Sequence, residues 1–280
     1  MGKFSDALAK AGTPPVKPGR QKPAEPKIEQ STDLIADLRL DTAPEEPQVE
    51  THCQFDGHVD PRLICFRDVK SPAAEYFKLL RAKILTHNSG TPLRTLMVTS
   101  SQPLDGKSIV AANLAVSIAH GINEHVLLVD CDLRRPSLHR LFGLEASRGL
   151  REYLEGDEPL GSYLLKTPVK KLSLLPAGNP PANPSELLSS QKMEALIQEM
   201  KTRYQDRYII LDATPAQFAA ETTCLATTVD GVLLVVRSGK TPGQLALDAI
   251  ENIGKKHILG VVFNASTENL RTYRKYYQYG

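Results

Sequence analysis

The sequence lacks the features that mark several common classes of protein. No apolar run approaches the roughly 18 residues that a membrane-spanning helix requires. The first ten residues contain no apolar core of a secretory signal, and Asp6 stands where a myristoylation signal has Ser or Thr. Only four cysteines occur, without a CxxC pair, so neither a disulfide framework nor a zinc site is expected. These absences favour a cytoplasmic protein with reduced thiols.

An excess of either charge is also missing. The 280 residues include 34 Lys and Arg against 32 Asp and Glu, which gives a formal net charge of +2. Such a balance produces no global field toward nucleic acid, and none is expected as a partner. Hydrophobic residues make up 41% of the chain, enough for a buried core, and the length predicts one or two domains.

Residues 1–67 differ in composition from the rest of the chain. Eight of the 20 prolines fall in this segment, apolar residues are sparse, and residues 14–47 alternate Pro, Lys and Glu. A segment of this kind cannot bury enough apolar area to offset the entropy lost on ordering. We therefore predict a disordered, proline-rich arm over 1–67.

Beyond the arm the sequence alternates short apolar runs with helical stretches. A helix is predicted to begin at Ser71-Pro72, which combines an N-cap residue with proline at the first helical position. The apolar runs are continuous, as in strands buried on both faces of a parallel sheet. The pattern predicts an α/β fold, a doubly wound and mostly parallel sheet flanked by helices. The predicted strands are 95–99, 125–130, 172–175, 208–212, 231–237 and 258–263, and the predicted helices include 107–120, 185–204 and 242–254.

A phosphate-binding loop follows the first predicted strand. The P-loop pattern is G-x-x-x-x-G-K-[ST], and here Ser101 replaces the first glycine while Gly106, Lys107 and Ser108 match. Backbone N–H groups at a helix N-terminus bind phosphate, the lysine contacts the β- and γ-phosphates, and the serine ligates Mg²⁺. The predicted nucleotide-binding residues of the loop are Ser101, Gln102, Pro103, Leu104, Asp105, Gly106, Lys107, Ser108 and Ile109.

Carboxylates stand at the ends of two further strands. One strand ends in Asp130-Cys131-Asp132, and a later strand ends in Asp212. Ligands of open parallel sheets lie beyond the carboxyl ends of the strands, so these side chains are expected beside the P-loop. Asp212 suits an Mg²⁺ contact, Asp132 is a second candidate metal ligand, and Asp130 or Asp132 suits the base that accepts a proton from an incoming hydroxyl. Together with Lys107 they are the predicted catalytic groups.

At these residues the sequence resembles the bacterial tyrosine kinase family of polysaccharide export systems. The resemblance covers residues 69–280 and rests on LLVDCDLRRPSLHRLFGL, on LSLLPAGNPPANPSELLSSQKM and on the Asp212 strand. It implies a protein-tyrosine autokinase that uses ATP and Mg²⁺ in a kinase domain over 68–270. The segment SPAAEYFKLLR resembles the helix through which that family assembles rings, with Glu75, Lys78 and Arg81 at its key positions.

The last eight residues carry four of the nine tyrosines. In the family such a cluster is the autophosphorylation site, so the tail 271–280 is expected to present Tyr273, Tyr276, Tyr277 and Tyr279. Each phosphate adds about −1.5 to −2 charge. The hypothesis that follows is a switch, in which unmodified tails hold a homo-oligomeric ring together and phosphorylated tails loosen it.

The resemblance also implies a purine contact at Asn264, a basic contact at Arg237, and a membrane-anchored activator that recruits this cytoplasmic chain to the inner face of the membrane. Departures from the family pattern leave two alternatives open. Leu104 replaces a loop glycine, which is tolerated if its φ is negative and motivates a degenerate, nucleotide-binding scaffold. A partitioning-type ATPase is the other alternative, although Gln102 stands where that class has its signature lysine.

Overall fold

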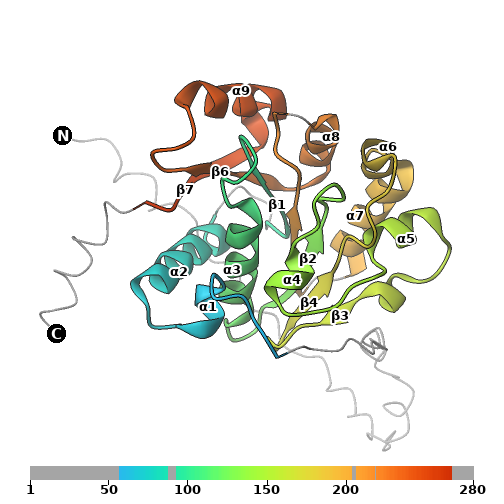
Figure 1. The fold of residues 1–280 in the computed structure, drawn as a ribbon, viewed down its shortest axis with the longest axis horizontal. Coiled ribbons are helices and arrows are strands. Elements are labelled where there is room, and N and C mark those ends of the chain that lie inside the picture. Colours follow the sequence, from blue (N-terminus) through green and yellow to red (C-terminus); the bar gives the residue numbers. More distant parts are fainter. Residues whose placement is uncertain (1–56, 88–92, 204–205, 218, 267–280) are drawn as a thin grey trace, which may run out of the picture. The chain divides into compact units, whose positions relative to one another are not determined.

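The computed structural model describes residues 57–87, 93–203, 206–217 and 219–266. A seven-stranded sheet forms the centre of this part of the chain (Figure 1). The strand order is β3-β4-β2-β5-β1-β6-β7. Every neighbouring pair is parallel except β3 and β4. The strands are β1 (Thr95–Ser100), β2 (His125–Asp130), β3 (Leu165–Lys166), β4 (Leu172–Leu175), β5 (Arg207–Asp212), β6 (Gly231–Arg237) and β7 (Ile258–Asn264).

All six strands expected from the sequence are present, and those in the interior of the sheet are mostly buried, whereas the edge strand β7 is partly exposed along its length. β1 is buried at each of its six positions, and β6 at all but its last. Side chains of one strand alternate between two apolar cores: Met97 packs in one and Leu96 and Val98 in the other. The two-residue edge strand β3 was not predicted because it is too short to show a pattern.

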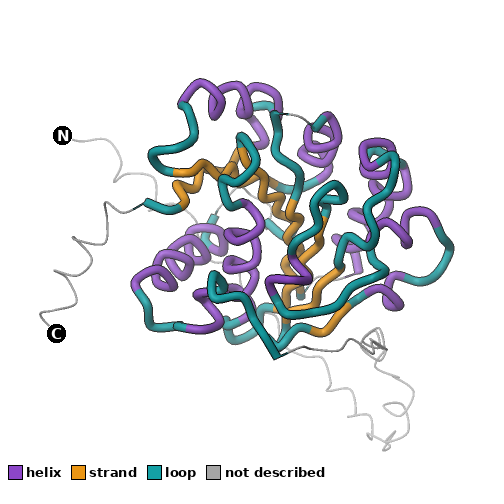
Figure 2. The backbone as a smooth tube through the Cα atoms, viewed as in Figure 1, coloured by secondary structure: helices purple, strands orange, loops and turns teal. Residues whose placement is uncertain are grey.

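Helices cover both faces of this sheet, which confirms the doubly wound α/β fold (Figure 2). One core includes side chains of α1–α4, and the other includes side chains of α5–α9. The helices are α1 (Ile64–Arg67), α2 (Pro72–Leu85), α3 (Lys107–Ala119), α4 (Leu138–Leu141), α5 (Leu150–Glu155), α6 (Pro184–Leu188), α7 (Gln191–Arg203), α8 (Ala220–Thr228) and α9 (Gly243–Ile253), with 3₁₀ turns η1 (Leu160–Tyr163) and η2 (Lys255–His257).

Local capping explains where two of these helices begin. The Ser71 hydroxyl accepts the Ala74 N–H (3.2 Å) at the start of α2, with Pro72 at the first helical position, as predicted. The single helix expected over 185–204 is instead two helices, α6 and α7. Ser190 Oγ accepts the Met193 N–H (3.2 Å), so this serine caps a new helix rather than continuing the first.

The structure differs from the predicted arm over residues 57–67, which belong to the folded unit. Leu63 is fully buried and Cys65 is buried, both against the core that includes α3. Asn113 of α3 holds the segment, because its Nδ2 donates to Arg62 O and its Oδ1 accepts the Cys65 N–H (2.9 Å each). Residues 1–56 lie outside the described residues, and their predicted disorder stays a prediction.

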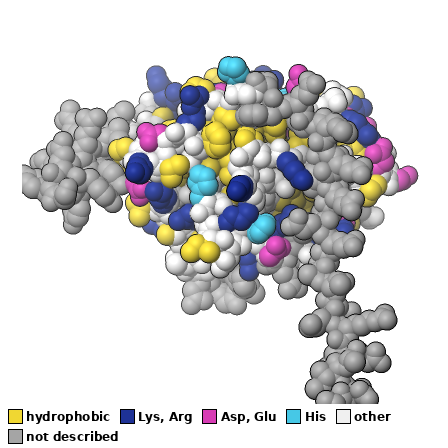
Figure 3. Space-filling model, turned by 90° about the horizontal axis from the view of Figure 1, so that it is seen from below, with side chains coloured by type: hydrophobic (Ala, Val, Ile, Leu, Met, Phe, Trp, Pro, Cys, Tyr) yellow, Lys and Arg dark blue, Asp and Glu magenta, His cyan; other side chains and the backbone are white. Residues whose placement is uncertain are grey.

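On the face that Figure 3 presents, Lys and Arg side chains are interspersed with acidic and apolar ones rather than gathered in one patch. Within the described ranges, none of the helices is long and apolar enough to cross a membrane.

Candidate active site

The predicted phosphate loop connects β1 to the N-terminus of α3. Gly106 immediately precedes the helix with φ +94°, and a Cβ built there would lie 2.1 Å from Asn264 Nδ2. Both observations require glycine at this position. The loop therefore presents its backbone and the first residue of α3, Lys107, at the carboxyl edge of the sheet.

Leu104, which replaces a loop glycine, has a left-handed backbone. Its φ is +70°, so the condition under which leucine fits without strain is not met. The side chain is 85% exposed and the Leu104 carbonyl accepts a hydrogen bond from Arg237 Nη1 (3.1 Å). Arg237, from the end of β6, thus holds the strained residue in place.

Asp105 ties the loop to neighbouring elements. Its buried carboxylate accepts the Gln102 N–H (3.2 Å), the Gln102 side-chain amide (3.3 Å) and the Thr241 hydroxyl (2.7 Å). Its carbonyl accepts from Asn264 Nδ2 (2.8 Å). The loop is consequently fixed from within and from both β6 and β7 before any ligand binds.

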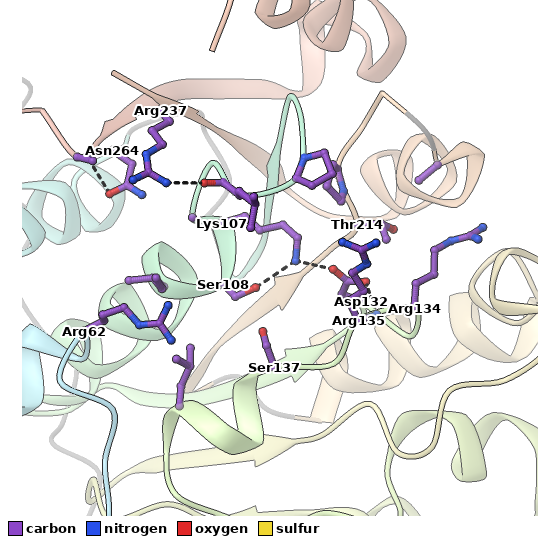
Figure 4. A pocket seen from close by; sticks show the side chains of 18 of the residues that line it. Arg62, Lys107, Ser108, Asp132, Arg134, Arg135, Ser137, Thr214, Arg237 and Asn264 are labelled. Atoms are coloured by element: carbon purple, nitrogen blue, oxygen red, sulfur yellow. Dashed lines mark hydrogen bonds and ion pairs between the residues drawn. The ribbon is translucent and has the colours of Figure 1, made fainter. Parts of the chain in front are cut away.

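Lys107 lies among the oxygens that the sequence assigns to a metal. Its Nζ is 2.8 Å from Asp132 Oδ2 and 3.1 Å from Ser108 Oγ (Figure 4). It also lies 3.3 Å from Asp212 Oδ1. Burial disfavours the charged ammonium, but the negative Asp212 and Asp132 outweigh burial and raise the pKa of Lys107. These hard oxygen donors suit Mg²⁺, and they already surround a cation in this structure. Across the described residues, no group of three or more His, Cys, Asp or Glu side chains is arranged to hold a metal by itself.

Asp130 is brought to the same edge but faces the protein interior. Its fully buried carboxylate accepts the N–H groups of Asp132 (3.2 Å), Ser137 (3.1 Å) and Leu138 (3.0 Å). Burial, and then the charge of the neighbouring Asp212, raise the pKa of Asp130 to about 7. Of the two candidate bases, Asp132 lines the pocket, whereas Asp130 shapes the loop between β2 and α4.

An open pocket of about 860 Å³ joins these groups. It includes most of the predicted loop residues together with Asp132, Arg237 and Asn264. Several other residues that line the pocket were not predicted from the sequence. Arg134 and Arg135 were visible in the acidic motif but had no role, and Pro61, Arg62 and Ile64 fall in the segment predicted to be disordered. The residues that line the pocket are Pro61, Arg62, Ile64, Pro103, Leu104, Gly106, Lys107, Ser108, Ile109, Asp132, Arg134, Arg135, Ser137, Leu141, Thr214, Pro215, Ala219, Arg237, Asn264 and Ala265.

The remaining predicted site residues lie apart from this pocket or outside the described chain. Ser101 is buried beneath the loop. On α2, Lys78 pairs with Glu75, and Arg81 Nη1 donates to Ser117 O of α3 (2.6 Å), so these side chains partly serve the chain's own packing. The four tail tyrosines lie outside the described residues.

The loop, the buried lysine and the strand-end carboxylates on a parallel sheet define a P-loop protein. Comparison with known proteins agrees. The chain is 34% identical over 220 residues to the tyrosine-protein kinase YwqD of Bacillus subtilis, across 78% of this chain and 91% of that protein. A crystal structure of the chimerical protein CapA2B2 is 30% identical, with a TM-score of 0.67 over 73% of this chain and 90% of that one. No protein-family model matches the chain.

The chain therefore belongs to the bacterial tyrosine kinase family of polysaccharide export systems. A more distant likeness is to the septum site-determining protein MinD from Pyrococcus horikoshii, at 22% identity and a TM-score of 0.53 over 64% of this chain and 72% of that one. At that level the likeness concerns the fold alone.

Proposed function

We propose that the chain is an ATP-dependent protein-tyrosine autokinase that regulates the polymerisation and export of a polysaccharide. The observation that carries the proposal is the convergence of Lys107, Ser108 and Asp132, which line one end of the pocket, with the fully buried Asp212, which contacts Lys107. Phosphoryl transfer needs a cation on the phosphates, oxygen ligands for a metal and a carboxylate that orients the attacking hydroxyl. This cluster offers all three.

In the proposed reaction Lys107 leaves its carboxylate partners and contacts the β- and γ-phosphates. Ser108, Asp212 and Asp132 would hold Mg²⁺, which neutralises charge on the phosphates when bound. Asp132 accepts the proton of the tyrosine hydroxyl, because it is the carboxylate that lines the pocket. Asp130 positions Asp132, because its carboxylate accepts the backbone N–H groups of Asp132, Ser137 and Leu138.

The base of the nucleotide is proposed to lie at the opposite end of the pocket, beside Asn264 and Arg237. Both side chains line this end and both hold the phosphate loop, through Asp105 O and Leu104 O respectively. An amide offers a donor and an acceptor to a purine edge. The remaining N–H of Asn264 Nδ2 is available for that contact while the first stays on the loop.

Regulation is proposed to run through assembly. The helix α2 would join subunits into a ring through Glu75, Lys78 and Arg81, and tail tyrosines of one subunit would enter the site of the next. A membrane-anchored activator would recruit the chain to the inner face of the membrane. Light scattering before and after incubation with Mg-ATP tests the ring hypothesis, and an unchanged mass contradicts it.

A labelling experiment tests the catalytic proposal. With γ-³²P-ATP and Mg²⁺, the chain should place label on its own tyrosines, because the proposed roles of Lys107, Ser108, Asp132 and Asp212 would together supply the groups that transfer needs. Lys107→Met should lose the label by about 10³-fold or more, since it removes the phosphate cation. Replacement of Tyr273, Tyr276, Tyr277 and Tyr279 by Phe should also remove it.

The same experiment separates the two alternatives. Free phosphate without labelled protein would indicate an ATPase of the partitioning type. Nucleotide binding with neither product would indicate a scaffold. The position of Gln102 speaks against the first, because its side chain is hydrogen-bonded to Asp105 within the loop instead of offering a cation.

A further inference from the structure

Five cationic side chains line the pocket, and four of them are held by partners within the protein. Arg62 forms a bidentate ion pair with Asp60. Lys107 contacts Asp132 and Asp212, and Arg237 donates to the Leu104 carbonyl. Arg134 pairs with Glu221. Arg135 is the exception, because its guanidinium makes no hydrogen bond or ion pair with any residue of the described ranges. Its planar set of donors is free for an anionic ligand.

The backbone of Arg135 is nevertheless fixed against the proposed base. Its N–H donates to Asp132 Oδ1 (3.1 Å), so the carboxylate that contacts Lys107 also orients the residue that carries this guanidinium. Figure 4 shows the Arg135 side chain on the Asp132 side of the pocket, while the Arg134 side chain turns away from Lys107. The side chains of these two neighbouring arginines therefore point to different parts of the site.

Arg134 anchors the loop to two other segments. Its Nε lies 3.2 Å from Glu221 Oε1 and its Nη2 donates to Ser185 Oγ (2.9 Å), while Ser185 Oγ donates to Glu221 Oε2 (2.9 Å). Glu221 is only 1% exposed, and it also accepts from the Thr214 hydroxyl (3.4 Å). Ser185 lies in the segment LSLLPAGNPPANPSELLSSQKM, and this contact joins that segment to the loop after β2.

We propose that Arg135 is a catalytic residue that binds the oxygens of the γ-phosphoryl group during transfer, and that Arg134, Glu221 and Ser185 position it. The inference rests on the proposed kinase function. The new bond forms between tyrosine Oη and the γ-phosphorus as the bond to the β–γ bridging oxygen breaks, its electron pair remaining on ADP. The tyrosine proton passes to Asp132. Charge spread over the γ-phosphoryl oxygens is what a bidentate guanidinium stabilises.

Arg135→Gln tests the catalytic role, with Arg151→Gln, at an ion-paired arginine on α5, as the control. Arg135→Gln should slow single-turnover labelling of tyrosine by at least about 100-fold, whereas the affinity for Mg-ADP changes less than about 3-fold. Binding of Mg-ADP with aluminium fluoride, which mimics the transferring phosphoryl group, should weaken by at least about 30-fold. Arg135→Lys should restore only part of the labelling rate, because lysine keeps the positive charge but cannot form the bidentate contact of a guanidinium.

Labelling by Arg135→Gln at the rate of the control, with unchanged aluminium fluoride binding, would overturn the inference. The aluminium fluoride measurement needs no acceptor tyrosine, so it tests Arg135 even if the unmodified chain binds nucleotide but labels no tyrosine. That last result would contradict the proposed function instead.

Ser185→Ala tests the positioning role, because it removes two contacts without leaving a buried charge unpaired. By itself Ser185→Ala should slow labelling about 3- to 10-fold. In a chain that already carries Arg135→Gln it should cause no further slowing, because both changes act through the Arg135 guanidinium. Equal slowing in both backgrounds would show that Ser185 does not act through Arg135.

Discussion

At the scale of single residues, Leu104 shows how a loop adapted to phosphates keeps its shape with an unsuitable side chain. A left-handed backbone costs a leucine about 1–2 kcal/mol. The loop retains it because Arg237 and Asp105 fix the backbone on either side of the strained position. Sequence alone identified the substitution but not the sign of φ, which depends on contacts more than 100 residues away in the chain.

Replacing Leu104 by glycine should therefore stabilise the protein. Relief of the strain exceeds the extra entropy of glycine in the unfolded chain, so Tm should rise by about 1–3 °C in a calorimetric scan. Leu104→Ala is the control, because it removes the same exposed side chain but keeps Cβ. An equal rise for alanine would mean that the backbone strain is not the cause.

At the scale of elements, the sequence predicted best what local patterns determine. The six predicted strands and the helix after the P-loop follow from runs of four or more residues with one preference, and the capped start of α2 follows from the Ser71-Pro72 pair. The division into α6 and α7 was missed, because Ser190 can either continue a helix or cap a new one. Arg62 was missed as a site residue because tertiary packing, not local pattern, brings it to the pocket, whereas Arg135 lies in the acidic motif but was given no role there.

Asp230 links three elements and gives a prediction that depends on pH. Its carboxylate accepts the N–H groups of Arg94 (2.9 Å) and Thr95 (2.8 Å) at the start of β1 and pairs with Lys201 of α7 (2.8 Å). Burial alone would raise the pKa of Asp230, but the Lys201 ammonium and the two N–H groups lower it below its ordinary value. The stability it contributes is therefore present above the unfolded pKa, about 3.9, and is lost as pH falls through the folded pKa.

Asp230→Asn should lower the free energy of unfolding by about 1–3 kcal/mol at pH 7, and the difference from the unmodified chain should shrink below about pH 4. Urea unfolding at a series of pH values measures both effects. Asp157→Asn, at a fully exposed carboxylate, should change stability by less than about 0.5 kcal/mol. A difference at Asp230 that stays constant down to pH 2 would contradict the assigned charge interactions.

At the scale of the whole molecule, the folded unit begins earlier than composition indicates. Proline and charge dominate residues 1–67 on average, yet Leu63 within them is as deeply buried as any residue in the sheet. An average over many residues cannot detect one leucine that packs against α3, nor the asparagine 50 residues later that bonds to its neighbour Arg62.

Leu63→Ala should accordingly destabilise the protein by about 2–5 kcal/mol, through lost burial and the cavity that remains. Leu79→Ala, at a leucine of α2 that is 55% exposed, provides the matched control and should change stability by less than about 0.5 kcal/mol. Denaturant unfolding of both variants decides the matter. Equal effects of the two substitutions would contradict the assignment of residues 57–67 to the folded unit.

The pocket has one more property, which is mechanical. Its walls include Pro61 and Arg62, near the start of the described chain, and Asn264 and Ala265, near its end. We therefore expect a force that pulls the two ends of the described chain apart to act on the walls of the pocket. A nucleotide bound between those walls would resist their separation. Tension on the two ends of the described chain would in turn lower the affinity of the site for nucleotide.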